Sequence, residues 1–462
     1  MADTAHKTEE EKKEFFDEPA VLDEKITMLA EMVLSSQYMT MFTGAGISTA
    51  CGIPDYRSGY NTVLETGPGC WETAANKQKY REEQKRAAAA GGGAQARAPA
   101  NPATLRTSIQ KAYPSITHMA MVELMEKNHL KHVVSQNVDG LHRKSGIPAA
   151  SISELHGNTN LEVCEECGRE YMRDHRVRNA QKTKEHRTGR KCESPGCNGH
   201  LKDTIINFGE NLNDAILMLG EQSCAHSDLC IAMGSSLRVS PANTFPQACA
   251  VNGGRLVICN LQKTPLDNHA TLCIYAKCDD IMKLLMQKLG YQIPTWQMKK
   301  RVEVSLIENG AKLQVRGVDD TRQPFHLFKT VHITGIGAKK NFPSQQQAKQ
   351  PYKVGLGAEA ERPAKVGLEL QFMGHYAEKN IKFDVDLAEL AGAGGSIVYE
   401  MIFDSPTGNW EVVVMQDSER SVIGVVEFTQ SDPPQAAASP KAGAAAGGRS
   451  ASPKPAGAAG GR

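Results

Sequence analysis

The stretch TGAGISTACGIPDYRSG, residues 43–59, decides the fold class of this chain. It follows an apolar run at residues 38–42, and Gly44 and Gly46 then allow backbone amides to approach a pyrophosphate. Thr49 stands where a dinucleotide-binding loop has its third glycine, and polar turn residues follow up to Arg57. Arg57 can pair with phosphate or shape the loop, and the alternative is a solvated surface arginine. The short glycine pattern alone is also typical of an ordinary strand-to-helix turn.

The composition sets broad limits on the kind of protein. The chain has 462 residues, enough for two or three domains, and its 53 basic and 52 acidic residues give a net charge of +1. Such a balance indicates no bulk attraction to nucleic acid or membrane. The first twenty residues are polar and acidic, and no apolar run approaches about 18 residues. We therefore expect an intracellular protein without a targeting peptide or membrane span.

Helical and strand-like runs alternate between residues 21 and 292. Residues 22–36 have helical periodicity, and the runs HVVSQN, LCIAMG and LVICNL are typical of buried strands. This alternation predicts a Rossmann-like parallel sheet with helices on both faces and a ligand site at the carboxyl ends of the strands. Residues 1–20 form an acidic N-terminal segment, and residues of about 72–110, rich in Ala, Gly and Pro, read as a flexible insertion.

Two cysteine pairs interrupt this pattern. Cys164 and Cys167 are separated by two residues, and Cys192 and Cys197 by four, with 24 residues between the pairs. This spacing is typical of a tetrahedral thiolate site for one structural Zn2+. We predict a small zinc-binding module at about residues 160–203, inserted into the sheet domain. Four thiolates would fill the coordination shell and leave no position for catalysis.

The periodicity changes to two beyond residue 298. Two alternating runs flank Asn309-Gly310, a strong hairpin signal, and about eight strands without helices predict a β-sandwich at residues 298–430. Residues 432–462 are low-complexity and are expected to be disordered. Two Ser-Pro-Lys sites there suggest phosphorylation or contact with nucleic acid, and the alternative is a plain solubilising tail.

Two further polar clusters are ambiguous in isolation. SQNVDGLH, residues 135–142, could bind a sugar or a carboxamide, or it could form an ordinary turn. In ELHGN, His156 could be a general base or a structural histidine.

Taken together, the order GAGISTACGIPDYR, SQNVDGLH, ELHGN, two cysteine pairs, NFGE, GSSLRVSPA and NLQKTPLD resembles the sirtuins. These are NAD-dependent protein-lysine deacylases, and the resemblance covers roughly residues 15–290. ISELHGN, LKDTIINFGE and KCDDIMKLLM are similar to the class IV branch, which contains nuclear sirtuins, and above all to its nucleolar type.

The resemblance implies roles for individual residues. His156 would be the catalytic base, with Asn137 beside it. Gln136, Asn137 and Asp139 would hold the ribose and the nicotinamide carboxamide. The remaining contacts to NAD would come from Ala45, Thr49, Tyr56 and Arg57 around the cofactor, and from Gly234, Ser235, Asn260, Gln262 and Cys278 at the adenosine half.

The implied reaction yields nicotinamide, an O-acyl-ADP-ribose and free lysine from acyl-lysine proteins, with histones as possible substrates. A mono-ADP-ribosyltransferase using the same site is the alternative, and a scaffold that has lost its chemistry is a third hypothesis. The branch implies the nucleus, with the cytoplasm as the alternative location. One departure stands out. Members of this branch usually have a short Gly-Pro-x-Gly-Val-Trp run directly after the arginine. Here GPGCW, residues 67–71, comes about nine residues late, after SGYNTVLET, and this leaves the position of Trp71 open.

Overall fold

The computed structural model describes most of the chain up to residue 426. The described residues are 8–75, 78, 82, 105–179, 184–319, 322–337, 345–347, 350–358, 362–373, 378–404, 409–415 and 420–426. Most of the expected flexible insertion and the whole C-terminal tail therefore lie outside the described residues. Among the described residues, no helix is both long and apolar enough to cross a membrane.

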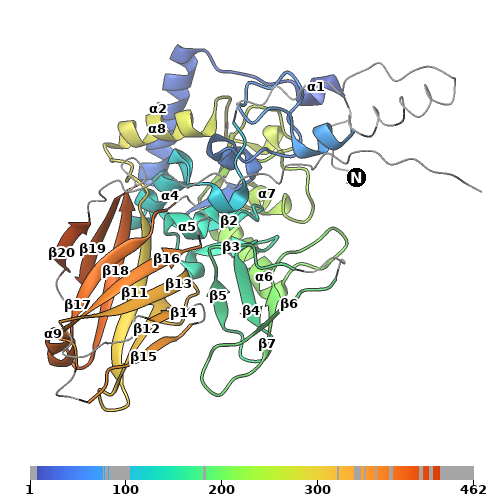
Figure 1. The fold of residues 1–462 in the computed structure, drawn as a ribbon. Coiled ribbons are helices and arrows are strands. Elements are labelled where there is room, and N and C mark those ends of the chain that lie inside the picture. The colour runs from blue at the N-terminus through green and yellow to red at the C-terminus, as the bar shows by residue number, and fades with distance from the viewer. Residues whose placement is uncertain are drawn as a thin grey trace, which may run out of the picture. The chain divides into compact units, whose positions relative to one another are not determined.

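A six-stranded parallel sheet forms the first half of the fold (Figure 1). Its order is β10-β9-β8-β1-β2-β3, so the chain starts in the middle and builds outward on both sides. The strands are short and fully or nearly buried, as expected for a parallel sheet covered on both faces. Their bounds are β1 Met39–Thr43, β2 Leu130–Ser135, β3 Ile152–Glu154, β8 Leu229–Met233, β9 Arg255–Cys259 and β10 Leu272–Ile274.

Helices cover both faces of this sheet and bury two separate cores. One core packs α2 (Pro19–Ser35), α4 (Ile116–Glu126) and α8 (Cys278–Leu289) against one face. The other packs α6 (Asp214–His226) and α7 (Thr244–Val251) against the opposite face. The Rossmann-like parallel sheet predicted from the sequence is thus present. The shorter helical segments are α1 Glu9–Lys12, α5 Leu141–Ser145, η1 Ala45–Cys51, η2 Ile109–Lys111, η3 Ala149–Ser151 and η4 Asp267–His269.

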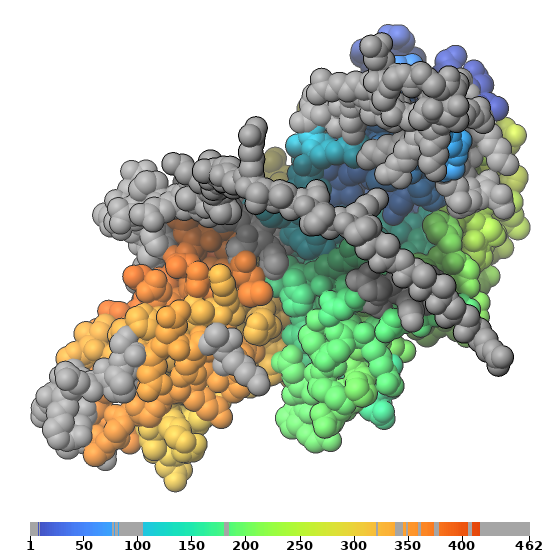
Figure 2. Space-filling view, turned by 45° about the vertical axis from the view of Figure 1, so that its right-hand side comes forward, coloured from blue at the N-terminus to red at the C-terminus, as the bar shows by residue number. Residues whose placement is uncertain are grey.

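A second, smaller sheet carries the cysteine pairs. It is antiparallel, in the order β5-β4-β7-β6, and forms a lobe coloured green in Figure 2. Its strands are β4 Leu161–Cys164, β5 Glu170–Met172, β6 Arg187–Lys191 and β7 His200–Asp203. The buried core of this lobe contains little beyond Tyr171, Leu201 and the cysteines. So small a core needs an additional constraint, and a bound metal is one way to provide it.

The C-terminal region is a two-sheet β-sandwich. The sheets have the orders β15-β12-β11-β18-β19-β20 and β14-β13-β16-β17, and Phe372 of one stacks on Trp410 of the other with ring centroids 4.6 Å apart. Glu308, Asn309 and Gly310 adopt positive φ in the turn of the predicted hairpin. The strands are β11 Met298–Ile307, β12 Lys312–Val318, β13 Phe328–Ile336, β14 Gln345–Gln347, β15 Tyr352–Gly355, β16 Lys365–Phe372, β17 Ile381–Asp386, β18 Ser396–Asp404, β19 Asn409–Met415 and β20 Arg420–Val426.

One expectation about this region is wrong. It contains a short helix, α9 (Leu387–Gly392), whereas the alternating pattern predicts strands without helices. Asp386 caps it by accepting hydrogen bonds from the amides of Ala388 and Glu389. An Asp N-cap before Leu-Ala-Glu-Leu is a helix-start signal that the strand pattern on either side obscured.

Candidate active site and metal centre

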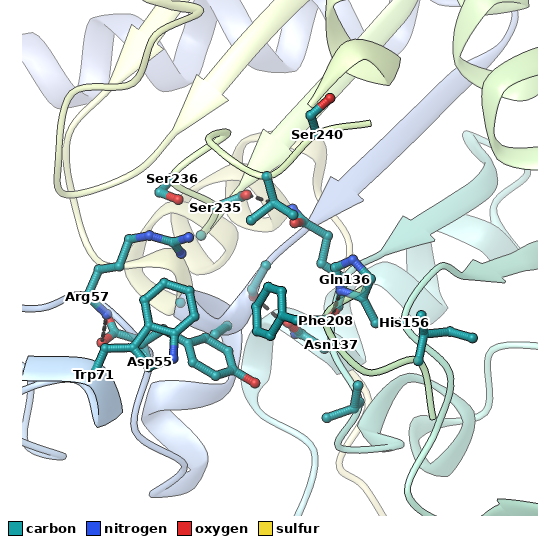
Figure 3. Close-up of a pocket in the computed structure, with 18 of the residues that line it drawn as sticks. Asp55, Arg57, Trp71, Gln136, Asn137, His156, Phe208, Ser235, Ser236 and Ser240 are labelled. Atoms are coloured by element: carbon teal, nitrogen blue, oxygen red, sulfur yellow. Dashed lines mark hydrogen bonds between the residues drawn. The ribbon is translucent and has the colours of Figure 1, made fainter. Parts of the chain in front are cut away.

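Two cavities lie at the carboxyl ends of the parallel strands. The central cavity collects residues from the loops after β1, β2, β3, β8 and β9 (Figure 3), where a doubly wound sheet binds its ligands. Its lining includes Ala45, Tyr56, Arg57, Trp71, Gln136, Asn137, His156, Phe208, Gly234, Ser235, Asn260 and Gln262. The second cavity shares Gly234, Asn260 and Gln262, and adds Thr49, Leu64, Glu65, Leu261 and Cys278.

The two glycines of the opening loop are required by close packing against the loop after β8. A Cβ on Gly44 would lie 2.6 Å from the carbonyl oxygen of Gly234, and one on Gly46 would lie 2.7 Å from its Cα. The Gly46 amide donates to the same carbonyl at 2.8 Å. These contacts bring two strand ends together and open the space above them. Thr49, in the position of the missing third glycine, donates its hydroxyl to the Gly46 carbonyl at 2.9 Å.

The polar residues after β2 are fixed by the loops on either side. Asn137 is almost fully buried and donates its side-chain amide to the Gly44 carbonyl at 3.0 Å. Gln136 donates to the Ser235 hydroxyl at 2.9 Å. Both face the central cavity. The side chains of SQNVDGLH therefore join three strand ends around one cavity, which is the arrangement that a binding loop requires.

Asp139 has a different position from the one expected. It is buried and is not among the residues that line either cavity. Its carboxylate accepts from the Ser48 hydroxyl at 2.7 Å and from the Leu141 amide at 2.9 Å. It therefore ties the loop after β1 to the loop after β2, and any effect on a ligand would pass through that connection.

His156 has the geometry of a general base. Its Nδ1 donates to the carbonyl of Gln136 at 2.9 Å, and this leaves Nε2 as the acceptor in the cavity that the ring lines. Burial lowers the pKa of His156 below its usual value of 6.5, and the hydrogen bond to Gln136 raises it by a smaller amount. The ring is therefore neutral at physiological pH, as a base must be.

The main chain around His156 is held by the segment that leaves the cysteine lobe. The His156 carbonyl accepts from the Ile206 amide at 3.1 Å, and the buried Asn158 amide donates to the Thr204 hydroxyl at 3.0 Å. Gly157 has φ +77°, and a Cβ there would lie 1.8 Å from the Thr204 carbonyl oxygen. The loop that carries His156 and the end of β7 therefore pack without space for a side chain between them.

An aromatic and cationic group covers the other side of the central cavity. The Arg57 guanidinium lies 4.5 Å from the ring centroid of Trp71, a cation–π contact, and Tyr56 and Phe208 flank the same indole with centroids 5.2 Å and 6.1 Å away. Burial lowers the pKa of Arg57 to about 10, so the side chain keeps its charge at neutral pH. Trp71 thus reaches the cavity despite its late position in the sequence (Figure 3).

The expected adenosine-side residues also converge. Asn260 donates to the carbonyl of Gln262 at 2.8 Å, which fixes the turn after β9. Thr49 and Cys278 line the second cavity beside both residues. All of the sequence-predicted cofactor residues except Asp139 therefore line one or both cavities.

Several lining residues have no role that the sequence alone predicts. Phe208 belongs to the NFGE motif, and its side chain is 72% exposed beside the cavity. Asp55 also lines both cavities, and burial raises the pKa of its carboxyl. Leu64 and Glu65 lie in the extra segment after Arg57, where no sequence pattern pointed to a site.

The four predicted metal ligands form one cluster. The ligand atoms of Cys164, Cys167, Cys192 and Cys197 all lie within 4.8 Å of one another. The sulfur atoms of Cys164 and Cys197 are 3.6 Å apart, and those of Cys167 and Cys192 are 3.7 Å apart. A tetrahedral Zn2+ with Zn–S distances of about 2.3 Å requires sulfur atoms separated by about 3.8 Å. The residues therefore fit a structural zinc ion and leave no open coordination position.

Comparison with known proteins identifies the family. The model of the Sir2 family matches residues 44–241. NAD-dependent protein deacetylase SRT1 of Arabidopsis thaliana is 39% identical over 348 residues, which are 73% of this chain and 66% of that protein. SRT1 of Oryza sativa subsp. indica is 32% identical over 373 residues, 78% of this chain and 68% of that protein. Human sirtuin-7 is 36% identical over 296 residues, 62% of this chain and 64% of that protein.

This chain spans about two thirds of the length of these relatives. The two plant proteins match 73% and 78% of this chain, which is more than residues 1–292 contain, so both matches extend into the β-rich region. The rice protein is matched over two thirds of its own length at more than 30% identity, and the Sir2 model spans both the glycine loop and the cysteine lobe. The chain therefore belongs to the Sir2 family, the sirtuins, and is similar both to sirtuin-7 and to plant SRT1 proteins.

Proposed function

We propose that this protein is an NAD-dependent protein-lysine deacylase. The observation that carries the proposal is the orientation of His156. Its Nδ1–H is committed to the Gln136 carbonyl, so Nε2 is the basic nitrogen in a cavity that Asn137, Ser235 and Arg57 also line. A base placed within a polar cavity at the ends of parallel strands suits proton abstraction from a bound dinucleotide. Relatives named as NAD-dependent protein deacetylases support the assignment.

The proposed reaction has two stages. The acyl oxygen of the substrate lysine first bonds to C1′ of the nicotinamide ribose as nicotinamide leaves. Nε2 of His156 then removes the proton from a ribose hydroxyl, and the resulting oxygen attacks the acyl carbon. After addition of water and loss of the amine, the products are nicotinamide, free lysine and an O-acyl-ADP-ribose. Asn137 and Gln136 would orient the nicotinamide ribose, because they line the cavity beside His156.

The segment after Gly46 would exclude water from the site. Once C1′ carries positive charge, water could hydrolyse NAD without deacylation, so the site must be covered during the first stage. Arg57, Trp71 and Phe208 form the cluster that borders the cavity on that side (Figure 3). We assign this cluster to covering the nicotinamide end.

Mass spectrometry of acyl-lysine peptides incubated with the protein tests the proposal. We expect acyl loss that requires NAD, with equal amounts of nicotinamide and O-acyl-ADP-ribose, and its abolition by His156→Ala. Full activity of that variant would refute the role of His156. Transfer of labelled ADP-ribose to protein without deacylation would establish the alternative mono-ADP-ribosyltransferase. Absence of any nicotinamide release would indicate a scaffold.

Substrates and location extend this proposal. We infer acyl-lysine proteins as substrates, with histones and other nuclear proteins as the expected class and the nucleus as the expected location. Support comes from the resemblance to the class IV branch and from the similarity to sirtuin-7. Microscopy of a tagged protein tests the location. Contact between the tail and nucleic acid stays a prediction, since the tail lies outside the described residues. Unchanged DNA affinity after deletion of residues 434–462 would remove it.

A further inference from the structure

The segment SGYNTVLET, residues 58–66, forms a loop that is closed at its base. The Gly69 amide donates to the Ser58 carbonyl at 2.8 Å, and the Trp71 amide donates to the Tyr56 carbonyl at 3.1 Å. Gly69 has to be glycine, since a Cβ there would lie 2.4 Å from the Arg57 amide nitrogen. The two ends of the loop are therefore adjacent, and Trp71 returns to the position beside Arg57 as if the extra residues were absent.

The loop turns its far end toward the second cavity. Leu64 and Glu65 line that cavity together with Asn260, Gln262 and Cys278. The Leu64 side chain is half-buried. The Glu65 carbonyl accepts from the Leu105 amide at 3.0 Å, which fixes the backbone at this point. Leu64 and Glu65 therefore form an outer wall of the cavity.

A short N-terminal segment, residues 11–15, holds this wall in place. The Glu14 carboxylate accepts from the Thr62 hydroxyl at 2.6 Å and from the Val63 amide at 3.0 Å. One residue later, the Phe15 amide donates to the carbonyl of Leu261 at 2.8 Å, and Leu261 lines the same cavity. The segment therefore joins the inserted loop to the turn after β9.

A second contact reinforces the same connection. The side-chain amide of Gln262 donates to the Lys12 carbonyl at 3.1 Å, and Lys12 forms an ion pair with Glu72 at 3.0 Å. Glu11 forms an ion pair with Arg238, in the loop after β8, at 3.1 Å. The N-terminal segment is thus bonded to three of the loops that surround the two cavities.

We propose that the inserted loop is an additional wall of the ADP-ribose site, in which Leu64 contacts the adenine and Glu65 accepts a hydrogen bond from adenosine. Glu14 is the positioning residue that holds this wall. The inference rests on the proposed function, because it takes the ligand of the two cavities to be NAD. The loop therefore raises affinity for the half of NAD that does not react.

Titration calorimetry of the full chain with ADP-ribose tests this assignment without any turnover. We expect Leu64→Ala to weaken binding roughly tenfold, the loss that follows when an apolar contact worth about 1.4 kcal/mol is removed. Glu14→Gln and Glu65→Gln should each weaken it about threefold. The matched controls are Val63→Ala in the same loop, whose side chain is exposed, and Glu10→Gln, an exposed residue just before the N-terminal segment. Both controls should bind within about twofold of the unaltered protein.

A parallel measurement of the KM for acyl-peptide separates the possible failures. We expect this KM to be unchanged in all five variants. Equal ADP-ribose affinity of Leu64→Ala and Val63→Ala would overturn the inference even in an active deacylase. Weaker ADP-ribose binding by Leu64→Ala in a protein without deacylase activity would support the inference and refute the proposed function. Failure of the unaltered protein to bind ADP-ribose would overturn both. If Leu64→Ala fails to fold, Glu65→Gln decides the question, because its exposed side chain is exchanged for one of the same size.

Discussion

Replacing Thr204 by Val removes one hydroxyl from beneath the His156 loop and keeps the shape of the side chain. That hydroxyl accepts from the amide of Asn158 at 3.0 Å and donates to the carbonyl of the same residue at 3.2 Å. Asn158 is completely buried, so water cannot replace the lost partner. Thr204 does not line either cavity and therefore acts on the reaction through the loop alone.

The size of the effect follows from these contacts. An amide left unsatisfied in a buried position costs about 1–3 kcal/mol. The loop can avoid that cost by moving, and His156 would then leave its position in the cavity. Returning His156 to that position costs no more than the unsatisfied amide, so this cost sets the upper limit of the loss in rate. Because about 1.4 kcal/mol corresponds to a factor of ten, deacylation by the Val variant should fall about tenfold to a hundredfold.

Nicotinamide exchange provides the discriminating assay. Exchange reverses the first stage of the proposed reaction, before His156 removes a proton, so displacement of His156 should leave its rate within about threefold of the unaltered rate. Thr204→Ser retains the hydroxyl and should keep both activities. Equal losses of exchange and deacylation in Thr204→Val would refute the reasoning, because they would indicate general damage to the site. Unchanged deacylation would refute it as well.

Three further predictions concern pH, metal and backbone geometry. Burial lowers the pKa of His156, and the proposed base must be neutral to act. In a pH profile of kcat/KM for acyl-peptide, the fall in activity on the acid side should therefore have its midpoint below pH 6.5. A midpoint above pH 6.5 would contradict this. Removal of metal by a chelator should unfold the cysteine lobe and abolish deacylation, and Cys164→Ser should lower the zinc content measured by mass spectrometry while Cys70→Ser, outside the cluster, should not. Gly157→Ala should lower the free energy of unfolding, measured by urea denaturation, more than Gly168→Ala does. Both glycines have positive φ, which costs an alanine about 1–2 kcal/mol, but only at Gly157 would the added Cβ lie 1.8 Å from a backbone oxygen. Equal losses of stability would show that the loop relaxes freely.

The parallel sheet and the metal ligands were predictable because their signals are local. Buried parallel strands read as continuous apolar runs, and β8 and the residues of β9 after Arg255 are such runs. Two thiolates separated by two to four residues can reach one ion from a single turn, so spacing alone indicated the zinc site. The helix α9 was missed for the converse reason, since six residues between two strands provide too little periodicity to distinguish a helix from a turn.

The chemical roles at the site depend on contacts between distant segments. The role of base that we propose for His156 depends on the contact between its Nδ1 and the Gln136 carbonyl, which lies twenty residues earlier in the chain. Asp139 looks like a binding residue in the sequence, but its carboxylate is directed to Ser48 and away from the cavities. No local pattern specifies which of several polar groups faces a ligand, because that choice depends on how separate strand ends meet.

By itself, the sequence determined the layered sheet, the cysteine ligands and the family, because periodicity, spacing and motif order are properties of neighbouring residues. Only the tertiary structure decided the place of the segment after Arg57. The segment is closed by the bond between Ser58 and Gly69, is held by Glu14 and lines the second cavity. These contacts join residues that are separated by up to about 50 positions or that belong to different loops. Such contacts form only when the burial of two cores brings the strand ends together, and no sequence window contains them.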